Sequence, residues 1–285
     1  MSYPDVEGGV KHGLAIKAFP SVEVLSIGEE LLIGKIANTN AQFLSRKVTS
    51  LGGRVIRVVT VGDDVQTIAD TLKEALNRKS TLILTTGGLG PTFDDKTLEG
   101  IAVGLEKPLV LDAEAFKQVK EKYEKLSAAR GQVLELTPAR VKMAKLPEGA
   151  EALSNPVGTA PGVLLRSEET VIIALPGVPS EMEAIFEESV APLIKKLSKN
   201  VFYEESLRLE RVYESDLAPM IDKVMRGNPW VYMKSHPRRE EGKAHIELHL
   251  TTSAENMETA KERVAQSVKE ISGLVVNFGG IVIRL

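Results

Sequence analysis

Through the first two thirds of the chain, short segments of β-branched and aliphatic residues alternate with segments of helical periodicity. Predicted strands lie at residues 22–27, 54–61, 81–85, 163–165 and 171–175. Such alternation is typical of a parallel or mostly parallel sheet with helices on both faces. In sheets of this kind, binding sites form beyond the carboxyl ends of the strands. Glycine-containing loops follow the first three predicted strands, so these loops are the first place to look for a site.

Polar residues at the predicted helix starts are interpreted as helix caps. Residues 38–40 offer side chains of the kind that cap a helix. Asp63 and Gln66 have the spacing of a capping box. Ser180 and Glu183 have the same spacing and predict another helix start.

The pattern changes in the last third of the chain. The predicted order there is strand, helix, strand, strand, helix, strand, with strands that include residues 230–234 and 245–250. This βαββαβ order predicts a small ferredoxin-like α+β domain. We therefore expect a leader at residues 1–21, an α/β domain at residues 22–200 and the small domain at residues 201–285.

Composition excludes several classes of protein. The 285 residues contain no Cys, which excludes disulfides, thiolate metal sites and a cysteine nucleophile. Only 4 His argue against a histidine-rich metal site. The net charge of −3 argues against nucleic acid or a membrane surface as a partner. Because no apolar run approaches the roughly 18 residues of a membrane span and no signal-peptide pattern opens the chain, we expect a cytoplasmic protein.

The segment Thr85–Thr97, TTGGLGPTFDDKT, carries the strongest local signal. Three glycines after a predicted buried strand let the backbone approach a ligand closely and present consecutive N–H groups. The helix that follows adds a partial positive charge suited to phosphate. Asp94 and Asp95 would repel that phosphate unless a divalent cation intervened or one of them acted as a general base. A tight turn with either aspartate as a helix cap explains the same residues structurally.

Asp63 and Asp64 follow another strand and open another helix. Asp is a favoured cap, so a structural role explains them as well, unless one of them faces Asp95 across the end of the sheet. Mg²⁺ typically binds through one or two carboxylates together with substrate phosphates. The candidate ligands of a divalent cation (Mg²⁺, Mn²⁺ or Co²⁺) are Asp63, Asp64, Asp94 and Asp95.

Two further loops contain glycine and proline, at residues 158–162 and 176–181. The second has the form of a strand-to-helix phosphate loop. Each is explained equally well as an ordinary turn of the scaffold. Glu29, directly after Gly28, is another candidate carboxylate, although a solvated helix start explains it equally well.

Six segments in the same order resemble the competence/damage-inducible protein CinA family. They are SIGEELL at 26–32, IANTN at 36–40, TVGDD at 60–64, TTGGLGPTFDD at 85–95, NPVGTAPG at 155–162 and LPGVPSEM at 175–182. The resemblance covers residues 22–197 and lies in the part that CinA shares with molybdopterin-binding proteins such as MogA and MoeA. The region after about residue 200 resembles the small domain that follows this module in CinA.

The resemblance implies a three-layer α/β/α first domain with a site for a nucleotide or pterin phosphate over residues 87–90. It implies metal-dependent hydrolysis of the pyrophosphate of ADP-ribose, to AMP and ribose 5-phosphate, or of a similar nucleotide, to AMP and a sugar phosphate. Asp95 and Asp63 fall on the acidic positions regarded as catalytic, either as base or as cation ligands. The residues expected to bind substrate are Gly28, Glu29, Asn40, Thr86, Gly87, Gly88, Leu89, Gly90, Thr97, Gly158, Thr159, Pro161, Gly177, Pro179 and Ser180.

Two departures limit what the resemblance implies. Leu89 stands where the MogA group has threonine, which favours the CinA side. Full-length CinA often carries a further C-terminal domain that deamidates nicotinamide mononucleotide, and we expect neither that domain nor that activity here. Two other functions stay open: a role in molybdenum cofactor assembly, such as adenylylation of molybdopterin, and a non-catalytic nucleotide-binding module. We also expect a homodimer or a higher homo-oligomer.

Overall fold

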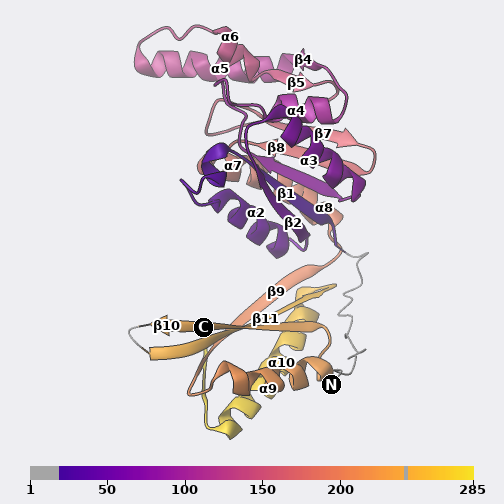
Figure 1. Ribbon diagram of the computed structural model, residues 1–285, viewed down its shortest axis with the longest axis vertical. Coiled ribbons are helices and arrows are strands. Elements are labelled where there is room, and N and C mark those ends of the chain that lie inside the picture. Colours follow the sequence, from indigo (N-terminus) through magenta and orange to yellow (C-terminus); the bar gives the residue numbers. More distant parts are fainter. Residues whose placement is uncertain (1–18, 241–242) are drawn as a thin grey trace, which may run out of the picture. The chain divides into compact units, whose positions relative to one another are not determined.

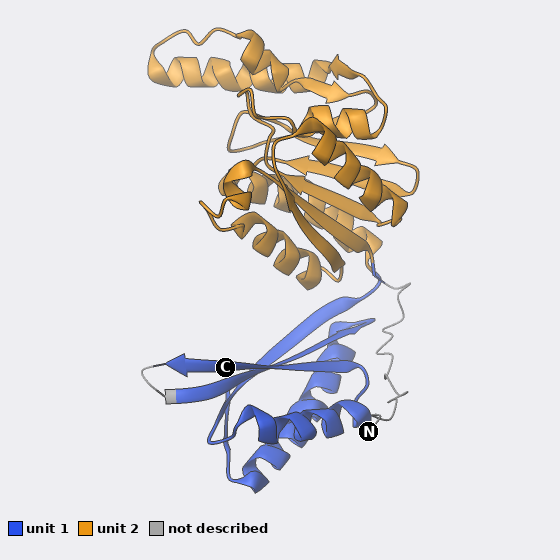
Figure 2. Cartoon of the chain, in the orientation of Figure 1, with its two compact units in different colours: residues 1–19, 199–285 blue, residues 20–198 orange. Residues whose placement is uncertain are grey.

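The structure is a computed structural model that describes residues 19–240 and 243–285 (Figure 1). The described chain forms two compact units, an N-terminal unit of Pro20–Ser198 and a C-terminal unit that includes Lys199–Leu285 (Figure 2). Most of the leader predicted at residues 1–21 lies outside the described residues, and Ser21 already begins the first strand.

The N-terminal unit is built on a six-stranded sheet with the order β2-β1-β3-β8-β7-β6. β2, β1, β3 and β8 are parallel, β7 is antiparallel to β8, and β6 is antiparallel to β7. The predicted mostly parallel sheet is therefore confirmed. The strands are β1 (Ser21–Ile27), β2 (Arg54–Val61), β3 (Leu82–Thr86), β6 (Glu151–Leu153), β7 (Gly162–Ser167) and β8 (Thr170–Leu175).

Helices cover both faces of this sheet, which makes three layers (Figure 1). Along β1, Val24 packs into one hydrophobic cluster and Leu25 into the other, because successive strand residues point to opposite faces. The layer on the Val24 side consists of α2 (Thr39–Ser50), α7 (Pro179–Ile185), a π-helical turn (Phe186–Val190) and α8 (Ala191–Leu197). The opposite layer consists of α3 (Val65–Asn77), α4 (Thr97–Gly104) and α5 (Ala113–Arg130).

The helix caps agree with the sequence in part. Asn38 caps α2, since its side chain accepts a hydrogen bond from the Ala41 N–H. The predicted capping box of Asp63 and Gln66 is wrong, because the residue that caps α3 is Asp64. The helix therefore starts one residue later than the box would place it, and Asp63 is left free for other contacts at the strand end.

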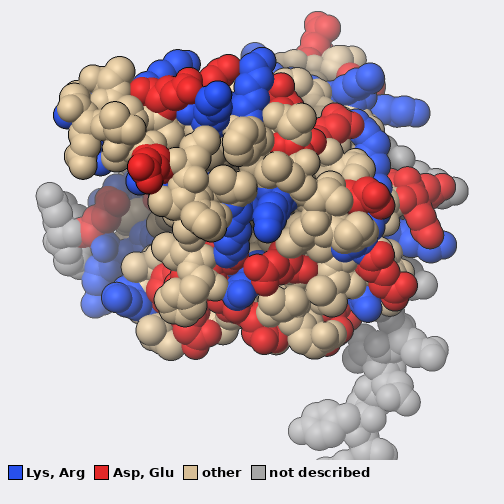
Figure 3. All heavy atoms as spheres, turned by 90° about the horizontal axis from the view of Figure 1, so that it is seen from above, with Lys and Arg blue, Asp and Glu red and all other residues tan. Residues whose placement is uncertain are grey.

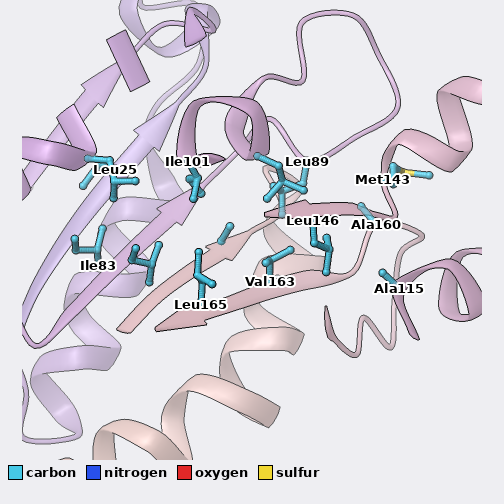
Figure 4. Close-up of a cluster of buried hydrophobic side chains, with 14 of the residues drawn as sticks. Leu25, Ile83, Leu89, Ile101, Ala115, Met143, Leu146, Ala160, Val163 and Leu165 are labelled. Atoms are coloured by element: carbon cyan, nitrogen blue, oxygen red, sulfur yellow. The ribbon is translucent and has the colours of Figure 1, made fainter. Parts of the chain in front are cut away.

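Several short elements had no counterpart in the sequence pattern, because three to five residues are too few to show a period. β4 pairs antiparallel with β5, and Met143 and Leu146 join the hydrophobic cluster that also contains Leu89 (Figure 4). This packing brings the segment around Met143 next to the loop after β3. Besides β6, these elements are β4 (Leu109–Leu111), α6 (Pro138–Lys142) and β5 (Lys145–Pro147), whereas α1 (Glu29–Leu32) forms where a helix start was one explanation of Glu29.

The C-terminal unit has an antiparallel four-stranded sheet with the order β10-β11-β9-β12. One hydrophobic cluster joins this sheet to both helices, so the predicted ferredoxin-like domain is confirmed. β10 and β11 are longer than predicted, because their ladder continues through polar pairs such as His236 and Glu247. The elements are β9 (Val201–Glu210), α9 (Glu214–Gly227), β10 (Val231–Glu240), β11 (Lys243–Ala254), α10 (Met257–Phe278) and β12 (Ile281–Arg284).

The face drawn in Figure 3 carries acidic and basic side chains side by side, without a large area of one sign. A mixed distribution of this kind favours a small ligand in a local site over a long polyanion bound across the face. Within the described ranges, no helix is both long enough and apolar enough to cross a lipid bilayer.

Candidate functional site

The glycine and aspartate segments singled out in the sequence lie at one edge of the sheet in the N-terminal unit. The loops that follow β1, β2, β3 and β8 begin at Gly28, Gly62, Gly87 and Pro176. These strands are parallel neighbours, so their carboxyl ends meet at the same edge. The loop at residues 154–161 joins them, because β7 runs antiparallel and starts where β8 ends.

Gly87 begins the loop after β3 in a conformation that glycine adopts far more easily than other residues. Its φ is +104°, and its N–H donates to the Leu175 carbonyl at 3.0 Å. A Cβ atom at this position would lie 2.1 Å from the backbone oxygen of Ile27. The loop therefore runs directly against the ends of β1 and β8, and a larger residue would force the backbone to move.

The next three amides, those of Gly88, Leu89 and Gly90, donate to no acceptor within the described part of the chain. Gly88 has a φ of +64°, which turns the loop at this point, and its carbonyl accepts from the Thr97 N–H at 3.2 Å. Consecutive free N–H groups are the donors from which concave anion sites are built. The loop thus leaves three successive backbone donors without an acceptor in the described chain.

The side chains of Thr97 and Leu89 anchor this loop to the buried part of the unit. Thr97 is fully buried, and its hydroxyl donates to the Gly87 carbonyl at 2.7 Å. Leu89 packs into the hydrophobic cluster that includes Ile101 (Figure 4). Both were expected to bind substrate. In the structure, Thr97 holds the shape of the loop, while Leu89 offers its amide and one part of an apolar wall.

Asp63 lies within electrostatic reach of the other acidic residues at this edge. Its Oδ2 accepts a hydrogen bond from the Glu29 N–H at 2.9 Å. Burial raises the pKa of Asp63, the hydrogen bond from Glu29 opposes that rise, and the charges of Glu30, Asp94 and Asp95 raise it further. The carboxylates of the loops after β2 and β3 therefore influence each other through their charges, although no hydrogen bond or shared contact joins them within the described residues.

One threonine holds both aspartates of the loop after β3. Asp95 Oδ2 accepts from the Thr92 N–H at 2.7 Å and from its hydroxyl at 2.6 Å, and Asp94 Oδ1 contacts the same hydroxyl. The Thr92 hydroxyl lowers the pKa of Asp94. Asp64 is engaged elsewhere: its Oδ1 accepts from the N–H and the hydroxyl of Thr67, both at 2.8 Å, and caps α3.

The four aspartates do not complete a metal site by themselves. No group of three or more His, Asp or Glu side chains in the described ranges is close enough to hold a metal ion. A divalent cation at this edge would need phosphate oxygens of the ligand to complete its coordination, which is the usual arrangement for Mg²⁺. The like charges around Asp63 fit such a cation, because it would relieve their repulsion.

Asp63→Asn is expected to raise the free energy of unfolding near neutral pH. The raised pKa means that the folded chain disfavours the charged carboxylate. This penalty is absent below the usual pKa of 3.8 and complete above the raised folded value, so the increase in the free energy of unfolding should vanish near pH 3. At neutral pH the increase should be at most about 0.5 kcal/mol, because Asp63 is partly exposed. Urea titrations at the two pH values measure it.

Asp64→Ala is the matched control for this prediction. Hydrogen bonds from Thr67 lower the pKa of Asp64, so its charge stabilises the folded chain at neutral pH. Removing this cap should therefore lower the free energy of unfolding. Equal destabilisation by both substitutions at pH 7 would contradict the interpretation of Asp63.

Asn40 connects three elements at this edge. From the first turn of α2, its Nδ2 donates to Thr86 Oγ1 and to the Gly177 carbonyl, both at 2.8 Å. The Thr86 hydroxyl donates in turn to the Pro176 carbonyl at 3.0 Å. The Asn40 Oδ1 atom is buried and has no partner among the described residues. A buried acceptor without a partner is unusual, and a donor group of a ligand would satisfy it.

The loop at residues 154–161 contacts the first turn of α7. A Cβ atom at Gly158 would lie 1.8 Å from Glu181 Oε2, and Asn155 Nδ2 donates to the same oxygen at 2.7 Å. Asn155 Oδ1 also accepts from the Gly158 N–H at 2.7 Å. Two segments of the sequence pattern therefore meet through Asn155 and Glu181, which were not among the expected site residues.

The remaining expected ligand-binding residues differ in accessibility. Gly177, Pro179 and Ser180 are exposed, Thr159 is half-buried, and Pro161 is buried. Ser180 is not a cap, because α7 begins at Pro179, whose fixed φ suits the first helical position. The Gly28 N–H donates to the Val61 carbonyl at 3.0 Å and is not available to a ligand.

A cavity of about 400 Å³ opens beside the loop after β3. Lys142 Nζ donates to the carbonyls of Thr92 and Asp95, at 2.8 and 2.6 Å, and Lys145 is exposed. No sequence signal could have found these lysines, since Lys142 lies 50 residues after Thr92, on a short helix. The cavity is lined by Gly88, Leu89, Gly90, Asp95, Leu98, Glu99, Leu109, Lys142, Met143 and Lys145.

Comparison with known families and structures relates these loops to other proteins. Residues 23–196 match the family described as "Probable molybdopterin binding domain". A protein of Aeropyrum pernix is 43% identical over 263 residues, 92% of this chain and 96% of the relative. A protein of Pyrobaculum aerophilum is 45% identical over 254 residues, 88% of this chain and 93% of the relative.

Among solved structures, this chain is similar to "The crystal structure of the protein CinA with unknown function from Thermoplasma acidophilum". The two are 40% identical, with a TM-score of 0.56, and the match covers 62% of this chain and 99% of the other. The similarity to CinA seen in the sequence motifs thus extends to the fold of one domain.

Proposed function

Because this chain belongs to the "Probable molybdopterin binding domain" family, we propose that it binds a phosphorylated ring compound, in the first place molybdopterin, at the loop after β3. The observation that carries the proposal is the row of free amides at Gly88, Leu89 and Gly90. These residues line the cavity to which Lys142 and Lys145 contribute. A phosphate there would accept hydrogen bonds from the amides and be attracted by both cations.

Asn40 supports a ligand that carries more than a phosphate. Its buried Oδ1 accepts no hydrogen bond from the described residues and lies over the ends of β3 and β8. A ring N–H or a sugar hydroxyl would supply the missing donor. Both molybdopterin and a nucleotide contain such groups.

A divalent cation (Mg²⁺, Mn²⁺ or Co²⁺) is proposed to accompany this ligand. Asp63 and Asp95 would hold it together with the phosphate, and Asp94 would add negative charge nearby. When bound, the cation would polarise a phosphoryl oxygen. The support is the repulsion among these carboxylates, which contributes to the raised pKa of Asp63. Asp64 is the weakest candidate of the four, because it caps α3.

Three kinds of chemistry share this site: binding alone, adenylylation of molybdopterin, and hydrolysis of the pyrophosphate of ADP-ribose. The family match favours molybdopterin over ADP-ribose as the ligand. Hydrolysis, implied by the resemblance to CinA, stays a prediction, since the Thermoplasma protein is described as having unknown function. In either reaction, Asp95 would act beside the phosphate as a base or as a ligand of the cation.

The proposal is tested by equilibrium binding of molybdopterin, AMP and ADP-ribose to the purified chain, with Mg²⁺ and with a chelator. We expect molybdopterin to bind most tightly and each affinity to fall when the cation is removed. Formation of AMP from ADP-ribose, followed by chromatography, would favour the hydrolase instead. Failure of all three ligands to bind would overturn the proposal.

Asp95→Asn is expected to reduce any turnover, either of ATP with molybdopterin or of ADP-ribose, by at least about 100-fold. The amide oxygen of Asn can still accept the hydrogen bonds from Thr92, so the loop should keep its shape and retain phosphate binding. Asp64→Asn is the comparison, because that side chain caps α3 and should leave turnover nearly unchanged. Undiminished turnover in Asp95→Asn would exclude the proposed role of Asp95.

A further inference from the structure

Phe93 is the most exposed large hydrophobic side chain among the described residues, with 87% of its surface accessible. It is not a member of any of the hydrophobic clusters in the described chain. An aromatic ring that stays exposed to water contributes no burial free energy to folding. The described chain therefore does not use this ring for packing, and its face is available for contact with another molecule.

The backbone on both sides of this ring is firmly held. Thr92–Asp95 forms a turn in which the Asp95 N–H donates to the Thr92 carbonyl at 3.3 Å, with Phe93 at the second position. The Thr92 N–H donates to the Asp95 carboxylate, and Lys142 Nζ donates to the carbonyls of both turn ends. The ring is thus presented from a fixed loop rather than from a loose one, which reduces the entropy cost of using it in binding.

The turn that carries the ring borders the proposed site. Gly90 and Asp95, which lie on either side of Phe93 in the chain, both line the cavity of about 400 Å³, whereas Phe93 itself does not line it, so the ring would meet a part of the ligand that extends beyond the cavity. A cavity of this volume is in the range that accommodates a small ligand. The free amides of Gly88 and Gly90 would bind the phosphate a few residues before Phe93 along the chain.

We propose that Phe93 stacks on the planar ring of the ligand whose phosphate binds at Gly88–Gly90. This inference rests on the proposed function and adds to it a positioning residue that selects ring-bearing phosphates over simple ones. Pterin and purine rings both present a π-face, and stacking on an aromatic side chain is tolerant of ring identity. Phe93 would therefore raise affinity for either class, while the hydrogen-bonding groups of the site would distinguish between them.

The test compares Phe93→Ala and Phe93→Tyr with the unaltered chain by calorimetry, using molybdopterin, AMP and inorganic pyrophosphate. Phe93→Ala should weaken molybdopterin and AMP by at least about tenfold and leave pyrophosphate unchanged. Phe93→Tyr should restore the affinity, because the π-face is retained. Tyr213→Ala, which removes an aromatic ring that is 79% exposed in the C-terminal unit, is the matched control and should change none of the affinities.

A fluorescence measurement provides a second readout. In a Phe93→Trp chain that also carries Trp230→Phe, the tryptophan at position 93 is the only one, because the sequence contains 1 Trp. Molybdopterin or AMP should quench its emission, and pyrophosphate should not. Ring ligands that bind equally well to Phe93→Ala would overturn the stacking inference alone. If the unaltered chain binds neither pyrophosphate nor the ring ligands, the proposed function fails together with the inference.

Discussion

Replacing Arg78 with Ala is expected to lower the free energy of unfolding by about 3–5 kcal/mol. Glu23 in β1 is fully buried, and the Arg78 guanidinium donates to both of its carboxylate oxygens at distances between 2.8 and 3.1 Å. Without Arg78, the buried charge keeps the Ser80 hydroxyl, at 2.6 Å, as a partner. One neutral hydroxyl cannot compensate for the desolvation of a carboxylate.

Glu74→Ala provides the comparison, because Glu74 pairs with the same Arg78 at 3.6 Å but is exposed. This surface pair should be worth less than about 0.5 kcal/mol. Urea denaturation of both variants at neutral pH measures the difference. A double variant with Leu at positions 23 and 78 should recover most of the loss, because it removes the buried charge together with its partner. Equal costs for Arg78→Ala and Glu74→Ala would contradict the prediction.

Gly87→Ala is expected to destabilise the chain by about 2–6 kcal/mol and to abolish phosphate binding. The φ of +104° strains any residue with a side chain, at a cost of about 1–3 kcal/mol. The added methyl group would also meet the Ile27 carbonyl at 2.1 Å, and relief of such overpacking costs about 1–3 kcal/mol more. Since Ile27 O belongs to the backbone of β1, the loop itself would have to move, and the amides that follow would lose their alignment.

Gly131→Ala separates the cost of the backbone conformation from the cost of the contact with Ile27. Gly131 ends α5 with a φ of +63°, and a Cβ atom there would meet nothing within 4 Å. This substitution should cost only about 1 kcal/mol, from the backbone conformation alone, and leave ligand affinity unchanged. Thermal unfolding and titration with pyrophosphate measure both effects. Similar costs at the two glycines would show that the contact with Ile27 carries no energetic weight.

Much of the edge where the site lies was predictable, because it depends on local sequence repeated at each strand. Each of β1, β2 and β3 is followed directly by a glycine and then by a helix. Parallel neighbours place such ends together, so Asp63 and Asp95 could be predicted to approach each other. The charge of Asp95 is the smallest of the contributions that raise the pKa of Asp63, and a shared catalytic role of the two residues stays a prediction.

The contributions of Lys142, Lys145 and Asn155 were not predictable. Lys142 and Lys145 come from α6 and β5, whose few residues show no periodicity, and they reach the site only because Met143 and Leu146 pack beside Leu89. Asn155 organises a loop between two antiparallel strands and contacts Glu181 across 26 residues of sequence. Contacts of this kind depend on packing between distant segments, which no local pattern records.

The amino-acid sequence alone determined the alternation of strands and helices, the glycines at the strand ends and the acidic residues beside them. These features depend on side-chain periodicity and on backbone freedom, which act over a few neighbouring residues. The tertiary structure decided which groups are free to bind. It assigned Thr97 to the support of the loop and Asp64 to a helix cap, and it left the Gly88–Gly90 amides and Asn40 Oδ1 without partners. Whether a polar group is satisfied is a property of everything packed around it, so only the folded chain shows it.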